Sequence, residues 1–413
     1  VVKAEEDYCL RHEIPFPHFN RLAGRPIKPS PLYDLLKSKG AVHEEVYGFE
    51  RPRWFTRDGV AQEDHYSFNR TAVDDVVAAE VKAVREGVGI MDVTAFTKVL
   101  VEGPDAYALL DRLTANRMPQ KVGSITLTHM LNRAGRIELE TTIVRMAEDR
   151  SYLVCAAFFE QRLLDHLNQN RSGEDAKITA LSSDWSALSL NGPRARDVLG
   201  QCTNADLGNA GFRWLSAQEI TVAGHSIWAF RMSYAGELGW EFHMPSAACL
   251  DVYNALWAAG EAHGVVDYGS FAMNVMRMEK GFKGAGELTN EVTLAEADVL
   301  RFARSDKDYL GRDKTLNTDL PWVCAYLEIE PDGVADGHGG EAVMLNGEVV
   351  GSTASVVYGP TVGKILAFAY IKPAAAKPDT ALEVVVHGHP RAARVLGEPA
   401  YDPESLKPRK DAS

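Results

Sequence analysis

The sequence has few cysteines and no long apolar run. Its 413 residues include five scattered cysteines, Cys9, Cys155, Cys202, Cys249 and Cys324, without a CxxC pair. Such spacing excludes a disulfide scaffold and is typical of a reducing compartment. No stretch reaches the roughly 18 apolar residues of a transmembrane helix, and the first residues do not resemble a secretory signal. We therefore expect no membrane partner and a cytoplasmic protein, or a mitochondrial matrix protein in a eukaryote.

The sequence also lacks an excess of positive charge and several common cofactor motifs. A net charge of -13 disfavours nucleic acid as a partner. No GxGxxG, Walker, GxSxG or HExxH motif is present, so the chain has no recognisable flavin or nicotinamide site of its own. His387 and His389 are spaced like metal ligands, but no third ligand lies near them in sequence, and we predict no metal site.

Three segments of the chain differ in their patterns, which suits a chain of two or three domains. Residues 1–70 contain many prolines and no regular apolar period, which predicts a connecting arm with one short helix over residues 30–40. Within the arm, residues 50–55 mix charges and aromatic rings, which predicts packing against another part of the protein, either the next domain or a domain outside this chain. Residues 71–308 alternate helix and strand patterns. Residues 309–413 contain short apolar strands and Gly turns, which predicts a small antiparallel β-barrel.

The middle segment contains an internal repeat. Val101-Glu-Gly-Pro104 returns as Leu190-Asn-Gly-Pro193 at an offset of 89 residues, and a helical apolar pattern follows each copy. The shared offset predicts one duplicated unit of mixed strands and helices. Each half also has a strand–turn–strand pattern, over residues 128–144 and 228–244, and we expect these hairpins to line one central cavity.

Apolar residues at helical spacing predict further helices over residues 73–88, 248–263 and 269–280. The last of these helices contains Arg277 and Glu279. Because these two residues lie on different sides of a helix, we do not expect both to face the core.

The second hairpin carries a candidate binding carboxylate. Gly236 and Gly239 permit a sharp connection, with Tyr234 expected at the end of one strand and Glu241 near the start of the next. Alternation along this strand places Glu241 on the face opposite the neighbouring aromatic rings. If buried, the carboxylate needs donors, and a pterin or guanine edge with two adjacent N–H groups supplies them. The alternative is an exposed glutamate on a solvated hairpin.

The first hairpin carries two carboxylates, Glu138 and Glu140, on the same face of its second strand. Paired carboxylates at this spacing act as general acid–base groups in some enzymes. The alternative is that they simply form the solvated face of a sheet.

Several motifs, in this order along the chain, resemble the glycine-cleavage T-protein (aminomethyltransferase) family. Tyr234-x-Gly236-Glu237-x-Gly239-x-Glu241 resembles the hairpin motif of that family. Leu131-Asn-x-x-Gly-x-Ile137, residues 276–281 and residues 309–313 fit the same family. Residues 30–34 and 47–55 resemble the segment that joins the flavin half to the folate half in dimethylglycine and sarcosine dehydrogenases. The resemblance covers essentially the whole chain.

The resemblance implies an α+β fold, with a duplicated α/β-hairpin folate-binding domain followed by the small antiparallel β-barrel. Tyr234 and Glu241 match the pterin-binding pair of the family, and the residues matched to its cofactor motifs also include Gly236, Gly239 and Arg277. Glu140 matches the position of an Asp near the folate nitrogens that receive the carbon, so the resemblance implies a catalytic role for it.

The chain departs from the family pattern in three places. Met273 stands where T-proteins have an Arg in the helix before Arg277. The segment 283–287 is one residue short and lacks an aromatic residue, and Leu-Ala-Glu-Ala-Asp at 294–298 replaces Pro-Leu-Glu-Ala-Gly. These departures imply a folate pocket that is altered on that side.

The implied activity is tetrahydrofolate-dependent one-carbon transfer, coupled to N-demethylation of a methylated amine such as dimethylglycine or sarcosine, which yields 5,10-methylenetetrahydrofolate. FAD would enter only through a flavoprotein domain or subunit outside this chain. Two other hypotheses stay open. One is a stand-alone folate-dependent demethylase or methyltransferase, and the other is a non-catalytic folate-binding or assembly module.

Overall fold

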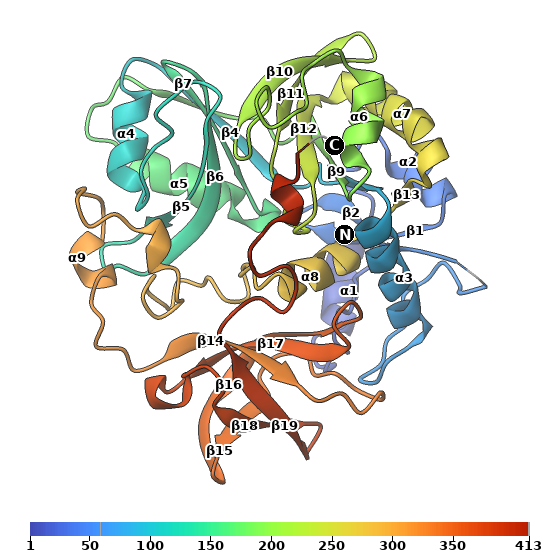
Figure 1. Cartoon of the computed structure of the whole chain (residues 1–413), viewed down its shortest axis with the longest axis vertical. Helices are drawn as coiled ribbons and strands as arrows, with labels where there is room; N and C mark the ends of the chain where they lie inside the picture. The colour runs from blue at the N-terminus through green and yellow to red at the C-terminus, as the bar shows by residue number, and fades with distance from the viewer. Residues whose placement is uncertain (58, 412–413) are drawn as a thin grey trace.

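Helix α8 (Ser270–Glu279) lies where the main parts of the molecule meet, with two β-sheets above it and a β-barrel below it in the view of Figure 1. The computed structural model describes residues 1–57 and 59–411. The other α-helices in these ranges are α1 (Val2–Cys9), α2 (Tyr33–Ser38), α3 (Ala72–Glu86), α4 (Ala106–Leu113), α5 (Glu160–Gln169), α6 (Ala195–Cys202), α7 (Cys249–Gly260) and α9 (Arg312–Thr315). None of the described helices is long and apolar enough to cross a membrane.

The helix boundaries follow local sequence signals. The hydroxyl of Thr71 accepts a hydrogen bond from the amide of Val73, and Asp74 accepts one from the amide of Thr71, so α3 begins with a capping box. The helices predicted over residues 73–88, 248–263 and 269–280 are confirmed as α3, α7 and α8 to within a few residues.

Two sheets form the middle segment. The first has the strand order β5-β6-β7-β4-β8, and the second has the order β10-β11-β12-β9-β3-β13. The strands of the first sheet are β4 (Thr97–Glu102), β5 (Ile125–Leu131), β6 (Ile137–Ala147), β7 (Arg150–Cys155) and β8 (Lys177–Ala180). Those of the second are β3 (Gly89–Asp92), β9 (Trp185–Asn191), β10 (Ala217–Val222), β11 (His225–Phe230), β12 (Gly239–Pro245) and β13 (Val266–Asp267).

The predicted repeat is confirmed. Strands β4 and β9 hold equivalent places in their sheets, and each leads into a helix of 8 residues, α4 or α6. Gly103 and Gly192 connect strand to helix with φ angles of 131° and 130°, which only glycine adopts readily. A Cβ at Gly192 would also lie 2.4 Å from the carbonyl oxygen of Gly87. The repeated Gly-Pro pair is therefore a steric requirement of the same turn in both halves.

The two hairpins singled out in the sequence are not counterparts within this repeat. Strands β5 and β6 are the first two strands of their sheet, whereas β11 and β12 are the second and third of theirs. The counterpart of β11–β12 is β6–β7. The sequence pattern identified both hairpins correctly. It did not reveal β7, the third strand of the first sheet, which pairs with β6 to form the counterpart of β11–β12.

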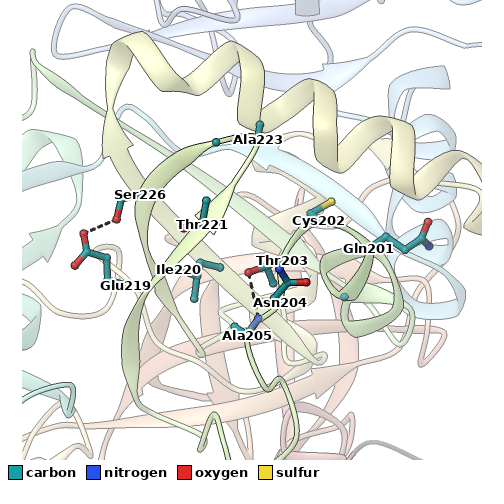
Figure 2. Close-up of a pocket in the computed structure, with 12 residues that line it drawn as sticks. Gln201, Cys202, Thr203, Asn204, Ala205, Glu219, Ile220, Thr221, Ala223 and Ser226 are labelled. Atoms are coloured by element: carbon teal, nitrogen blue, oxygen red, sulfur yellow. Dashed lines mark hydrogen bonds between the residues drawn. The ribbon is translucent and has the colours of Figure 1, made fainter.

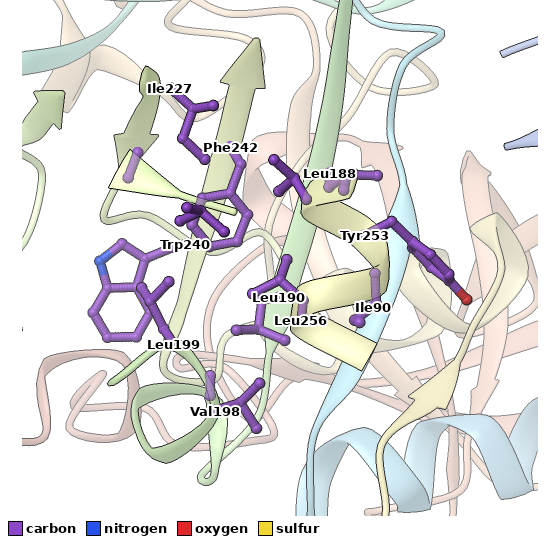
Figure 3. Packing of buried hydrophobic residues seen from close by; sticks show 14 of the residues in the cluster. Ile90, Leu188, Leu190, Val198, Leu199, Ile227, Trp240, Phe242, Tyr253 and Leu256 are labelled. Atoms are coloured by element: carbon purple, nitrogen blue, oxygen red, sulfur yellow. The ribbon is translucent and has the colours of Figure 1, made fainter. Parts of the chain in front are cut away.

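Apolar side chains fill the space between the second sheet and helices α6 and α7 (Figure 3). Trp240 and Phe242 of β12 point into this cluster with Leu199 of α6 and Leu256 of α7. Burial of each such side chain contributes about 1.5–3 kcal/mol of transfer free energy. This packing fixes which face of β12 is turned away from the helices.

The arm packs against the rest of the chain, as predicted for residues 50–55. It contains the antiparallel hairpin of β1 (Ala41–Val46) and β2 (Phe49–Phe55), and Trp54 is buried in a cluster with residues of α3 and α8. The predicted helix over 30–40 is shorter, Tyr33–Ser38, and the hairpin and α1 were not evident from the sequence. Leu32 and Leu36 join the core of the second sheet. The division of the chain at residue 70 stays a prediction.

The C-terminal part is a closed antiparallel barrel of order β14-β17-β16-β15-β18-β19. Its strands are β14 (Val323–Ile329), β15 (Ala342–Leu345), β16 (Glu348–Gly359), β17 (Lys364–Ile371), β18 (Ala381–Val386) and β19 (His389–Leu396). The polar composition of β19 concealed it in the sequence. After the barrel, residues 401–411 return to the second sheet, where the side-chain amide of Asn209 donates to the carbonyl of Arg409 (Figure 1, red).

Helix α8 is enclosed on nearly all sides. Both Arg277 and Glu279 are buried, so the expectation that they would not share the core is wrong. The physical reason is that each side of the helix packs against a different neighbour. Arg277 contacts the loop after the helix and Ser355 of the barrel, whereas Glu279 contacts Arg85 of α3.

Candidate functional site

Glu241 lies in β12 between Phe230 of β11 and Ser189 of β9. Because Trp240 and Phe242 point into the helix-side core, Glu241 projects from the opposite face of the sheet (Figure 3). Glu241 is only 7% exposed, so the alternative of a solvated glutamate is wrong. The sequence pattern correctly predicted its face.

The hydrogen bonds of Glu241 differ from those of every other buried carboxylate in the described residues. These buried carboxylates are Glu50, Glu80, Asp92, Glu237, Glu241, Asp267, Glu279 and Glu287. All except Glu241 accept at least one hydrogen bond from a side chain or a backbone amide. Burying a carboxylate without donors is costly. Glu241 is therefore the one buried acid of the described residues that accepts no hydrogen bond within them.

An imidazole lies next to this carboxylate. Nε2 of His243 is 3.6 Å from Oε2 of Glu241, and Nδ1 of His243 is 3.1 Å from the hydroxyl of Tyr152 in β7. Burial lowers the pKa of His243, which favours the neutral ring, and burial raises the pKa of Tyr152. The arrangement fits the tautomer in which Nδ1 accepts from Tyr152 and Nε2–H faces Glu241. The first sheet thus orients a side chain of the second.

Glu140 also has an imidazole neighbour. His129 of β5 is its directly paired residue on the adjacent strand, and Nε2 of His129 lies 3.4 Å from Oε2 of Glu140. The side chain of Glu140 is 27% exposed, whereas that of His129 is fully buried. Glu138 lies two residues before Glu140 but is 4.0 Å from Arg162 of α5. The two acids of this strand therefore have different partners.

Tyr234 is not at a strand end, as was expected, but within the loop between β11 and β12. Arg85 of α3 holds this loop by donating to the carbonyl of Ala235 and to the carboxylate of Glu237. The hydroxyl of Tyr234 donates to the carbonyl of Lys283 at 3.0 Å. Burial, and to a lesser degree the charge of Glu140, raise the pKa of Tyr234. Glu140 and Tyr234, from different halves, are thus within electrostatic reach of one another.

The ring of Tyr234 stacks on Phe282, with centroids 6.0 Å apart and an interplanar angle of 18°. Phe282 follows α8, and its carbonyl accepts a hydrogen bond from Arg277. The same guanidinium group donates to Glu287 at 2.9 Å and to Ser355 at 3.3 Å. Arg277 therefore holds the loop that supports Tyr234. Its predicted direct contact with the cofactor stays a prediction.

The two glycines of the motif permit close packing. Gly236 has φ 75°, and a Cβ there would lie 2.8 Å from Cδ of Lys280. A Cβ at Gly239 would lie 2.2 Å from Oδ1 of Asn191. Both glycines let the hairpin loop lie against its neighbours, and their predicted cofactor contacts likewise stay predictions.

A surface cavity of about 680 Å³ lies between the end of α6 and the β10–β11 hairpin (Figure 2). Its lining comprises residues 200–205 together with Glu219, Ile220, Thr221, Ala223, Gly224 and Ser226. The carboxylate of Glu219 accepts a hydrogen bond from Ser226 and so has a partner within the protein. This cavity contains none of the residues predicted for the site.

The family comparison agrees with the fold. Residues 32–307 match the GCVT N-terminal domain, and residues 323–402 match the glycine cleavage T-protein C-terminal barrel domain. The chain belongs to the glycine-cleavage T-protein family. Aminomethyltransferase T of the glycine cleavage system from Bartonella henselae has the same fold, with a TM-score of 0.78 and 21% identity over 94% of this chain and 100% of that chain.

Among this family, two longer mouse proteins are similar to nearly the whole chain. Dimethylglycine dehydrogenase, mitochondrial, of Mus musculus is 32% identical over 98% of this chain and 48% of its own length. Sarcosine dehydrogenase, mitochondrial, of the same organism is 30% identical over 98% of this chain and 50% of its own length. Both are enzymes. The chain thus spans about half the length of these relatives.

The T-protein fold confirms the predicted architecture. Sequence reasoning missed His129, His243 and Phe282, which contact predicted residues directly, and Tyr152, which contacts His243. A usable signal existed for two of them. His129 and His243 occupy alternate positions in strands that also carry buried apolar residues, and such histidines need polar partners.

Proposed function

We propose that this chain binds tetrahydrofolate between its two sheets and transfers a one-carbon unit to it. Tetrahydrofolate supplies the nitrogen atoms that receive the carbon. The proposal is supported chiefly by Glu241, a buried carboxylate that accepts no hydrogen bond in the described residues. The pterin edge carries adjacent N–H donors of the kind that such a carboxylate binds in a bidentate manner. The names of the two dehydrogenases support chemistry on methylated amines.

Each residue of the candidate site has a role in this proposal. Glu241 binds the pterin edge, and His243 orients Glu241. Tyr234 and Phe282 provide a stacked aromatic wall. Glu140, partly exposed and within electrostatic reach of Tyr234, holds or releases the proton at the folate nitrogen and stabilises developing positive charge.

The carbon unit comes, in this proposal, from N-demethylation of an amine such as dimethylglycine or sarcosine. Oxidation of an N-methyl group requires a two-electron acceptor, and we propose FAD on a flavoprotein domain or subunit outside this chain. The mitochondrial dehydrogenases that the chain resembles are about twice as long as the region matched. For a eukaryotic source we propose the mitochondrial matrix, and otherwise the cytoplasm.

The assignment of Glu241 is tested by folate binding, measured by isothermal titration calorimetry with tetrahydrofolate under anaerobic conditions. Glu241→Gln and Glu241→Ala should both weaken binding by about 30- to 1,000-fold, which corresponds to roughly 2–4 kcal/mol. The amide is nearly as harmful as alanine because it presents a donor where an acceptor is needed. Glu219→Gln, an exposed acid on the same sheet, is the matched control and should bind like the parent. Equal affinity of Glu241→Gln and the parent would remove the pterin assignment.

A binding module without catalysis is the second candidate, and the segment 283–298 supports it. The carbonyl of Lys283 accepts the hydrogen bond of the Tyr234 hydroxyl, so this hydroxyl already has a partner. A Cβ at Gly284 would lie 3.0 Å from the same hydroxyl. The altered segment therefore packs directly on a residue of the candidate site. Folate binding by the parent without carbon transfer, even with a flavin partner, would favour this module.

A further inference from the structure

His129 is a polar side chain without a hydrogen-bond partner in the described residues. The residue is fully buried, and neither Nδ1 nor Nε2 forms a hydrogen bond. One face of its surroundings is apolar, since its ring lies 5.7 Å from that of Phe302. The polar group facing it is Glu140, at 3.4 Å from Nε2. An imidazole in this position has one evident polar interaction, and that interaction is with the proposed acid–base residue.

The strand register fixes this contact. His129 and Glu140 are directly paired residues of β5 and β6, and their side chains therefore project from the same face of the sheet. Because His129 has no exposed surface and Glu140 is 27% exposed, the imidazole reaches the open side of the sheet only through the carboxylate. A flexible glutamate whose carboxylate is anchored from behind loses alternative rotamers before the reaction begins.

We propose that His129 is a positioning residue for Glu140, acting through an Nε2–H that faces the carboxylate. The inference rests on the proposed function, because it assigns His129 a role in the acid–base step given to Glu140. Glu138, on the same strand face, is not paired with His129 in the strand register and lies 4.0 Å from Arg162. The difference explains why only one of the two acids is prepared for catalysis.

Kinetics of the whole chain test the role. The assay follows formation of 5,10-methylenetetrahydrofolate and water from tetrahydrofolate and formaldehyde, above the uncatalysed rate. His129→Leu should lower kcat by about 10- to 100-fold, as expected for a misplaced catalytic group, and leave KM for tetrahydrofolate nearly unchanged. His129→Gln, which retains a side-chain N–H donor, should recover most of the rate. In a Glu140→Gln background, His129→Leu should cause almost no further loss, because the two residues act as one unit.

A spectroscopic measurement tests the contact independently of activity. Nitrogen NMR of imidazole-labelled protein without ligand should show His129 as the Nε2–H tautomer, and the Nε2 resonance should shift in Glu140→Gln but not in Glu138→Gln. Thermal melting identifies any variant that fails to fold. If His129→Leu does not fold, the rate of His129→Gln and the NMR measurement of the tautomer test the positioning role instead.

The outcomes separate the two proposals. Absence of transfer by the parent, with the flavin partner also supplied, would overturn the proposed function and the positioning role together. Full transfer by both the parent and folded His129→Leu would overturn only the positioning role. An Nδ1–H tautomer whose nitrogen resonances do not shift in Glu140→Gln would also overturn the positioning role.

Discussion

Two neighbouring acids of the second hairpin, Glu237 in the loop and Glu241 in the strand, have opposite surroundings. Glu237 receives a hydrogen bond from Arg85 at 3.1 Å, and the same guanidinium group binds Glu279 at 2.9 Å. Glu241 and Glu140 accept no hydrogen bond from the residues that the structure describes, and each lies beside an imidazole, at 3.6 and 3.4 Å. A carboxylate neutralised by a buried cation joins parts of the fold, whereas one without donors remains available to a ligand.

The two acids of this single sequence motif therefore have different roles. Glu237 and Glu241 belong to the same Tyr-x-Gly-Glu-x-Gly-x-Glu stretch. Arg85 connects Glu237 to α3, and the hydroxyl of Tyr401 donates to Glu237 from the C-terminal segment. Hence the first acid holds the loop in place, and the second is the one we assign to the ligand.

The largest effect is expected where an acid without a buried cation is altered. Glu140→Gln should retain folate binding and overall stability but reduce one-carbon transfer by about 10²- to 10⁴-fold, the usual effect of losing a positioned acid–base group. Transfer is measured as formation of methylenetetrahydrofolate. Glu138→Gln, on the same strand face, is the control and should transfer at nearly the parent rate. If both variants keep full activity, neither carboxylate is the catalyst.

At Arg85 we expect a loss of stability, in contrast to Glu140→Gln, which should lower activity and leave stability unchanged. Arg85→Met leaves Glu279 buried without its cation and Glu237 with only Lys407 at 3.8 Å, which should lower the free energy of unfolding by about 3–5 kcal/mol in urea titrations. The control is Arg194→Met, which removes an exposed pair with Asp197 and should leave stability near that of the parent. A loss at Arg85 no larger than the control would show that these glutamates do not depend on it.

A smaller, pH-dependent effect is expected at Glu80, a buried acid that accepts from the amides of Phe55 and Gly269 and forms no ion pair with any described residue. Burial raises its pKa from 4.5 to about 7. Between these values the folded state binds more protons than the unfolded chain, so stability falls as pH rises through this window and stays low above it. The free energy of unfolding should drop by about 2 kcal/mol from about pH 5.5 to about pH 8.

Glu80→Gln is the variant that examines this pH effect. It removes the titrating group and should flatten the decline seen in urea titrations at several pH values. An unchanged decline in Glu80→Gln would assign the pH dependence to other groups.

Local patterns predicted much of the fold. Helical spacing in α3 and α7 depends only on neighbouring residues, and the predicted ranges 73–88 and 248–263 agree closely with the structure. The repeated Gly-Pro turns also follow from local steric limits at Gly103 and Gly192. In contrast, β19 was missed because its alternation is largely polar, and the sequence gives no direct measure of which strands close a barrel.

The sequence by itself determined helices α3, α7 and α8 and the face of β12 on which Glu241 lies, because each follows from residue spacing of two or about 3.6. Only the tertiary structure decided which acids would have partners. The contact of Tyr152 with His243 joins residues 91 positions apart, from different sheets. Whether a carboxylate is neutralised depends on such groups, which are distant in the sequence. The residues of the strand that carries the carboxylate do not specify which distant groups will lie beside it.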